Sequence, residues 1–143
     1  MSIANVLLVD DEVNFVKTFS ERLVLRDLDI LKAFSGKEAL QVLEQNKNVE
    51  VVILDVKMPG MDGIEALAKI RKRFPLVEVI MLTGHEDVKS AIDGMKKGAF
   101  DYLMKPCNMD QIIAKVTEAA KKKRRHEEKI IQVRIKEITS RHI

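Results

Sequence analysis

Short apolar runs alternate along the chain with amphipathic segments. Strand-like runs rich in apolar residues occupy residues 5–9, 51–54, 79–82 and 100–104, and a weaker one, which contains Asp29 and Lys32, occupies residues 29–33. Residues 51–54 are apolar at every position, as is typical of a central strand that is buried on both faces. The segments between the runs have helical spacing, and residues 13–26 place Phe15, Phe19 and Leu23 on one face. This alternation predicts five strands, each followed by a helix.

The expected helices have recognisable starts and stops. Ser35, Asp62 and Asn108 are each followed three residues later by Glu or Gln, which is the pattern of a helix N-terminal cap. Pro75 stops the third helix and Gly98 ends the fourth. Five βα units in regular order predict an α/β fold, in which a doubly wound parallel sheet is covered by helices on both faces.

Polar residues follow every expected strand but the second. They are Asp10, Asp11, Asp55, Thr83 and Lys105. In a parallel sheet the carboxyl ends of the strands share one edge, where ligands bind at the switch point in strand order. We therefore expect these five side chains to form one site.

The charge distribution divides the chain near Ala120. Residues 1–120 carry 16 Lys and Arg against 19 Asp and Glu, whereas residues 121–143 carry 9 against 3. The overall net charge of +3 thus combines a mildly acidic body with a basic tail. We expect a domain over residues 1–120 and a basic helical extension over residues 121–143.

The tail has several possible roles. No Pro or Gly occurs after Asn108, so the last helix can continue past Arg125 as one rod, and Ile131, Ile135 and Ile138 give it a narrow apolar stripe. The tail could be a solvated helix end, a dimerisation or docking helix, or a linker toward an output domain. Its basic residues have no interleaved aromatics and no helix-turn-helix follows them, which argues against nucleic-acid binding.

Two features bear on location. Cys107 is the only cysteine, which excludes an internal disulfide and favours the cytoplasm. No apolar run approaches the ~20 residues of a membrane-spanning helix, and we expect no contact with a membrane.

The expected site suits phosphate chemistry. Three crowded carboxylates repel one another unless a cation lies among them, and Mg²⁺ binds carboxylate oxygens while keeping positions open for phosphate. The carboxylate of Asp55 can attack phosphorus to form an acyl phosphate, Lys105 can pair with a phosphate oxygen, and Thr83 can donate its hydroxyl. Each residue alone has a plainer explanation: an acidic helix start for Asp10 and Asp11, a turn cap for Thr83, a solvated charge for Lys105.

Together these residues resemble the receiver domain of two-component response regulators. The resemblance covers roughly residues 3–120 and rests on four strings, at residues 6–12, 54–63, 81–84 and 98–106. It implies a flavodoxin-like sheet of order 2-1-3-4-5. It also implies that Asp55 accepts a phosphoryl group from the phosphohistidine of a sensor histidine kinase or a phosphotransfer protein. Its catalysis would be limited to accepting and slowly losing this group.

The resemblance assigns further roles. Asp10, Asp11, Asp55 and the backbone carbonyl of Lys57 would hold Mg²⁺. Thr83 and Tyr102 would act as the switch that remodels the surface toward a partner, a second copy or an output domain, and Lys105 would precede Pro106 through a cis peptide bond. Tyr102 can equally be a half-buried strand aromatic with a polar tip.

Two other functions compete with this interpretation. A Mg²⁺-dependent phosphate hydrolase needs a second acid soon after its nucleophile, and Lys57 occupies that place. A receiver-like interaction module that works without phosphorylation does not need the complete set of acids, Thr83 and Lys105.

Overall fold

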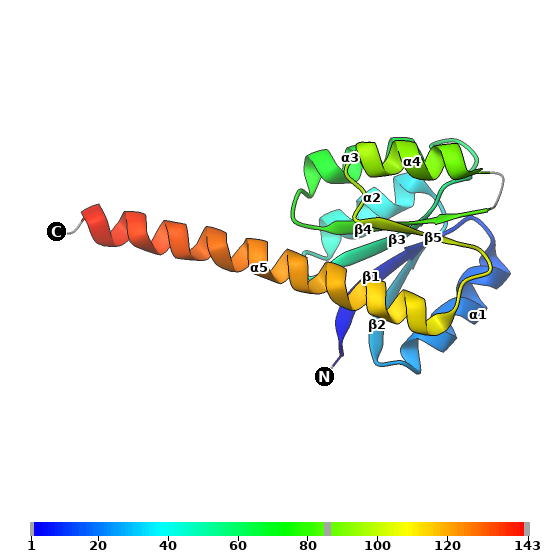
Figure 1. The fold of residues 1–143 in the computed structure, drawn as a ribbon, viewed down its shortest axis with the longest axis horizontal. Coiled ribbons are helices and arrows are strands. Elements are labelled where there is room, and N and C mark those ends of the chain that lie inside the picture. The colour runs from blue at the N-terminus through cyan, green and yellow to red at the C-terminus, as the bar shows by residue number, and fades with distance from the viewer. Residues whose placement is uncertain (1, 85–86, 142–143) are drawn as a thin grey trace.

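The computed structural model describes residues 2–84 and 87–141. Five residues of the expected domain and of its expected extension lie outside the described part: Met1, His85, Glu86, His142 and Ile143. Strands and helices alternate as expected (Figure 1). The strands are β1 (Ala4–Val9), β2 (Leu28–Ala33), β3 (Val51–Asp55), β4 (Glu78–Thr83) and β5 (Asp101–Met104). The helices are α1 (Val13–Val24), α2 (Gly36–Gln45), α3 (Gly63–Arg73), α4 (Val88–Lys96) and α5 (Met109–Arg141).

The five strands form one parallel sheet in the order β2-β1-β3-β4-β5, which confirms the expected topology. Helices α2, α3 and α4 cover one face and α1 and α5 the other (Figure 1). Successive residues of β3 point to opposite faces: Val52 and Leu54 join one apolar core, and Val51 and Ile53 the other. Burial on both faces explains why residues 51–54 of this strand are all apolar.

The expected helix caps are confirmed. Ser35, Asp62 and Asn108 each accept a hydrogen bond from the backbone N–H three residues further on, at 3.1, 2.9 and 3.4 Å. Helix α1 ends at Val24, two residues earlier than expected, and Asp27 follows with a left-handed φ of 66°. The side chain of Asp tolerates this conformation better than most, so the chain can turn sharply into β2.

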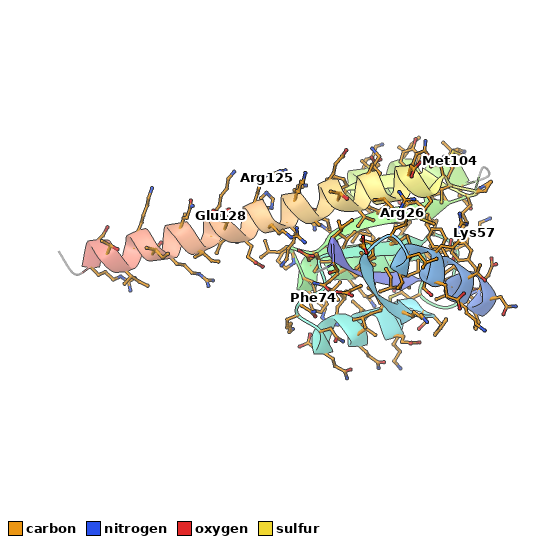
Figure 2. All side chains as sticks on the ribbon, turned by 90° about the horizontal axis from the view of Figure 1, so that it is seen from below. Arg26, Lys57, Phe74, Met104, Arg125 and Glu128 are labelled. Carbon is orange, nitrogen blue, oxygen red and sulfur yellow. The ribbon has the colours of Figure 1, made fainter. Side chains whose placement is uncertain are left out.

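Helix α5 continues unbroken for 33 residues, which confirms the expected rod. At 1.5 Å per residue it is about 50 Å long. Its last buried residue is Lys123, and none of residues 124–141 is buried. Figure 2 shows Arg125 and Glu128 on the part of α5 that projects beyond the body. No helix of the described residues is long and apolar enough to cross a membrane.

The base of this projecting helix is anchored by buried acids at the amino-terminal edge of the sheet. Glu50, which precedes β3 and is 6% exposed, accepts hydrogen bonds from Arg124 at 2.6 and 2.9 Å. It also accepts one from the backbone N–H of Asn5 at 3.0 Å. Arg124 in turn donates to the carbonyl of Ile3 at 2.9 Å. This fork-like pairing ties α5 to both β1 and β3.

A second buried acid adds to the anchor. Glu78, the first residue of β4, is 1% exposed and lies 3.4 Å from Lys122 of α5 and 3.5 Å from Arg71 of α3. The basic run that begins the extension therefore does not simply point outward. Two of its side chains pair with buried carboxylates: Arg124 with Glu50, and Lys122, together with Arg71, with Glu78.

We predict that Arg124→Gln lowers the free energy of unfolding by about 2 kcal/mol at pH 7, because it leaves the Glu50 carboxylate without its main partner. Losing one member of a fully buried pair costs about 3–5 kcal/mol, and the half-exposed Arg124 makes the loss smaller. Urea unfolding measures this difference. Arg125→Gln, one residue further and exposed, is the matched control and should change stability by less than about 0.5 kcal/mol.

The pH dependence gives a second readout of the same pair. Burial raises the pKa of Glu50, but the hydrogen bonds and charge of Arg124 outweigh it and hold the pKa below its ordinary value of 4.5. The stabilisation is therefore complete above pH 4.5 and is lost as the pH falls through the lowered pKa. A difference between wild type and Arg124→Gln that persists unchanged at the lowest pH would contradict this assignment.

Candidate functional site

The register of the sheet brings the expected residues together at its carboxyl edge. Val9 pairs with Leu54, so Asp10 directly after β1 lies level with Asp55 at the end of β3. Thr83 pairs with Met104, which places Lys105 beside the end of β4. These four residues come from four adjacent strands, β1, β3, β4 and β5. Lys57 and Met104, labelled in Figure 2, mark this end of the body, away from the projecting part of α5.

Three carboxylates form the centre of the site. Asp10, Asp11 and Asp55 each offer an oxygen, and these oxygens lie within 4.8 Å of one another. Asp10 and Asp55 are buried, whereas Asp11 is exposed. Burial and the charge of Asp10 raise the pKa of Asp55 to about 6, although Lys105 opposes this rise. Burial and the neighbouring acid thus disfavour the ionised form of Asp55, and a further positive charge nearby would stabilise that form.

Lys105 supplies the positive charge within the cluster. Its ammonium nitrogen lies 2.8 Å from Asp10 Oδ2 and 3.4 Å from Asp55 Oδ1. Burial lowers the pKa of Lys105, but these two carboxylates more than compensate and raise it above its ordinary value. The peptide bond between Lys105 and Pro106 is cis, as the resemblance implied. The lysine is thus a charged group in contact with the candidate nucleophile.

The two expected switch residues lie near each other but differ in exposure. Thr83 is buried, and its hydroxyl lies 3.5 Å from the carbonyl of Leu103 while its own carbonyl accepts a hydrogen bond from the N–H of Lys105. Tyr102, on β5, is 40% exposed. A weakly held hydroxyl on a buried threonine can be redirected toward a new acceptor at little cost.

The loop after β3 is held close to the site. The ammonium of Lys57 lies 3.3 Å from the carboxylate of Asp87 at the start of α4. Gly63, the first residue of α3, packs directly on the backbone of Asp55 and Val56, and a Cβ there would lie 2.6 Å from the Cα of Val56. Only glycine fits at this close approach, which fixes α3 against the end of β3.

One neighbour of the site was not singled out from the sequence. Phe15 was expected only as part of the apolar face of α1, yet its ring centre lies 4.4 Å from the ammonium of Lys105. Sequence patterns offered no way to find this contact, because the two residues are 90 positions apart and the phenylalanine also satisfies the helical spacing of a core residue.

The donor set fits a hard divalent cation. All side-chain donors are carboxylate oxygens, the ligand type that Mg²⁺ prefers. A cation here would also offset the repulsion and burial that raise the pKa of Asp55. The arrangement therefore combines a cation site, a nucleophile and a positive side chain at one edge of the sheet.

Comparison with known proteins identifies a family and relatives to which this chain is similar. The family model described as "Response regulator receiver domain" matches residues 6–117. The curated relatives include the DNA-binding transcriptional regulator NtrC of Klebsiella pneumoniae, which is 37% identical over 78% of this chain. A putative NtrX-like response regulator of Rickettsia bellii is 37% identical over 79% of this chain. The chain spans about a quarter of the length of these relatives, 24% in each case.

Solved structures agree with the sequence comparison. A response regulator receiver domain from Clostridium thermocellum superimposes with a TM-score of 0.81 at 36% identity. The similarity covers 85% of this chain and 97% of that one. The fold of this chain, with its sheet order, is therefore also that of a solved receiver domain.

Proposed function

The chain belongs to the family of response regulator receiver domains, and from this premise we propose that Asp55 accepts a phosphoryl group from the phosphohistidine of a sensor histidine kinase or phosphotransfer protein. Receivers of two-component systems are controlled by phosphorylation, and the curated relatives are regulators rather than classical enzymes. The observation that carries the proposal is the position of Asp55. Its carboxylate lies within 4.8 Å of oxygens of Asp10 and Asp11 and 3.4 Å from the ammonium of Lys105.

The proposed reaction is a simple displacement. A carboxylate oxygen of Asp55 attacks phosphorus, the P–N bond of the phosphohistidine breaks, and the imidazole leaves with the bonding electron pair. The product is an acyl phosphate on Asp55. Such a transfer needs alignment and neutralisation of charge more than covalent assistance, which matches the charged groups of this site.

Lys105 and Thr83 act on the phosphoryl oxygens. Lys105 pairs with one oxygen as a point charge, and the Thr83 hydroxyl turns from the carbonyl of Leu103 toward another. We propose that Tyr102 changes rotamer with Thr83 and so alters the surface formed by α4, β5 and α5. Tyr102 is 40% exposed, so a partner protein that binds this surface can contact its side chain.

Mg²⁺ is the cofactor that we propose. Asp10, Asp11, Asp55 and the backbone carbonyl of Lys57 would hold it, and when bound it neutralises charge on the phosphoryl oxygens. The side chain of Lys57 takes no part, since it pairs with Asp87.

Other functions fit the site less well. A phosphate hydrolase needs an acid near Asp55 to protonate the leaving group, and the corresponding position is Lys57, whose side chain is bound elsewhere. A module that works without phosphorylation would have no use for a buried acid pair held by Lys105. A location in the cytoplasm stays a prediction from the single cysteine, and contact with nucleic acid or membrane through this chain is not expected.

We predict that incubation with Mg²⁺ and acetyl phosphate adds about 80 Da, one phosphoryl group, to the intact protein. Asp55→Asn should show no gain, because it removes the nucleophilic carboxylate, and chelation of Mg²⁺ by EDTA should suppress the gain in wild type. Intact mass spectrometry measures both. Equal gains in wild type and Asp55→Asn would contradict the assignment, and steady release of inorganic phosphate at a high rate would favour a hydrolase.

We also propose that the extension over residues 121–143 joins two copies of the chain. Ile131, Ile135 and Ile138 lie on one side of α5 and are 51–56% exposed, although isoleucine is among the residues most often buried. The anchor at Arg124 and Glu50 holds the base of this helix to the body, so the stripe is presented in a defined direction. Paired with the same stripe of a second copy, these side chains would leave water.

Light scattering after size-exclusion chromatography tests the stripe, with and without acetyl phosphate. We predict that wild type dimerises in one of the two states and that Ile135→Lys abolishes the dimer. Val133→Lys is the matched control, because Val133 is exposed to nearly the same degree, 55%, but lies about 160° from Ile135 around the helix. A wild type that is monomeric in both states, or equal effects of the two variants, would refute this role of the tail.

A further inference from the structure

The ammonium of Lys105 has a third neighbour, and this one carries no charge. The nitrogen lies 4.4 Å from the centre of the Phe15 ring, in addition to its contacts with Asp10 at 2.8 Å and Asp55 at 3.4 Å. A cation within about 6 Å of the face of an aromatic ring is attracted by the ring's quadrupole. Lys105 is therefore held by two carboxylates and one ring.

The ring of Phe15 is itself held in place. Phe15 lies in the first turn of α1, and it stacks on Phe19 one turn further along, with ring centres 5.0 Å apart and an angle of 18° between the planes. Phe19 is 5% exposed and belongs to the apolar core between α1, α5 and the sheet. A core residue thus restrains the ring that contacts the lysine.

Of the three contacts of Lys105, the proposed reaction changes the two with carboxylates and leaves the one with the ring of Phe15 unchanged. Asp10 and Asp55 are the acids proposed to hold Mg²⁺, and an oxygen of Asp55 becomes bonded to phosphorus. Both carboxylates are then engaged elsewhere, whereas a hydrocarbon ring binds neither Mg²⁺ nor phosphate. Until a phosphoryl oxygen pairs with it, the ammonium on the long, flexible stem of Lys105 would otherwise be free to move into water.

We infer that Phe15 is a positioning residue, whose ring keeps the Lys105 ammonium beside Asp55 while Mg²⁺ and the phosphoryl group occupy the carboxylates. The inference rests on the proposed phosphoryl transfer to Asp55. It differs from a role in packing alone, because packing needs only apolar volume at this position. Phe15 is also less buried than Phe19 and Leu23 on the same face of α1, which are 5% and 0% exposed.

The test compares aromatic and non-aromatic side chains at position 15. Wild type, Phe15→Leu and Phe15→Tyr are incubated with Mg²⁺ and a series of acetyl phosphate concentrations, and intact mass gives the rate of phosphorylation. Leucine keeps the apolar volume and loses the ring, so the maximal rate should fall about threefold to tenfold. Tyrosine keeps the ring and should restore the rate to within about twofold. Phe15→Met serves as a second non-aromatic variant if Phe15→Leu does not fold.

A second background separates positioning of the lysine from general packing. In Lys105→Met the ammonium is absent, so adding Phe15→Leu should not slow phosphorylation further. The inference is overturned if Phe15→Leu reacts like wild type, or if its effect is as large in the Lys105→Met background. It also falls if wild type itself gains no phosphoryl group, a result that refutes the proposed function and is distinct from the other two.

Discussion

The main physical constraint on this structure is the repulsion among three carboxylates, whose oxygens lie within 4.8 Å of one another and which must be neutralised. The ends of β1 and β3 place Asp10, Asp11 and Asp55 there, and two of the three are buried, where charge repulsion is least screened. Neutralisation by positive charge is therefore a requirement of this edge. Lys105 meets part of it, but burial and the charge of Asp10 outweigh the effect of the lysine and keep the pKa of Asp55 raised. This balance is the reason for our proposal that the edge binds a cation and phosphate.

At the opposite edge of the sheet, buried carboxylates are neutralised in a different way. Glu50 and Glu78 are also buried acids at strand ends, but Arg124 and Lys122 of α5 neutralise them from within the chain. Each of these acids already has a positively charged partner within the chain, and the two pairs anchor helix α5 to the sheet. The same type of side chain thus forms the proposed phosphoacceptor site at one edge and a structural joint at the other. Helix α5 packs against the sheet between the two, so it is a continuous element through which phosphorylation of Asp55, as we propose it, could act.

Much of this architecture could be predicted from the sequence, because it depends on local patterns. The five strands follow from their apolar runs, and the caps at Ser35 and Asp62 follow from short-range hydrogen bonding. The strand order came from the resemblance to receivers and not from the pattern. The pairing of Arg124 with Glu50 and the contact of Phe15 with Lys105 could not be predicted, because Arg124 and Phe15 lie on helices. The rule that gathers residues at strand ends says nothing about helix residues. Their meeting depends on where the completed sheet places the ends of its strands.

The competition between Lys105 and a divalent cation for the same carboxylates tests this account most directly. Calorimetric titration of Mg²⁺ into wild type and Lys105→Met measures it. Removing the ammonium frees Asp10 and Asp55 and adds net negative charge, so the account predicts Mg²⁺ binding about fivefold tighter in Lys105→Met, the equivalent of about 1 kcal/mol between unit charges 4 Å apart in water. Equal or weaker binding in Lys105→Met, or no binding in wild type, would contradict the claim that these groups form one site.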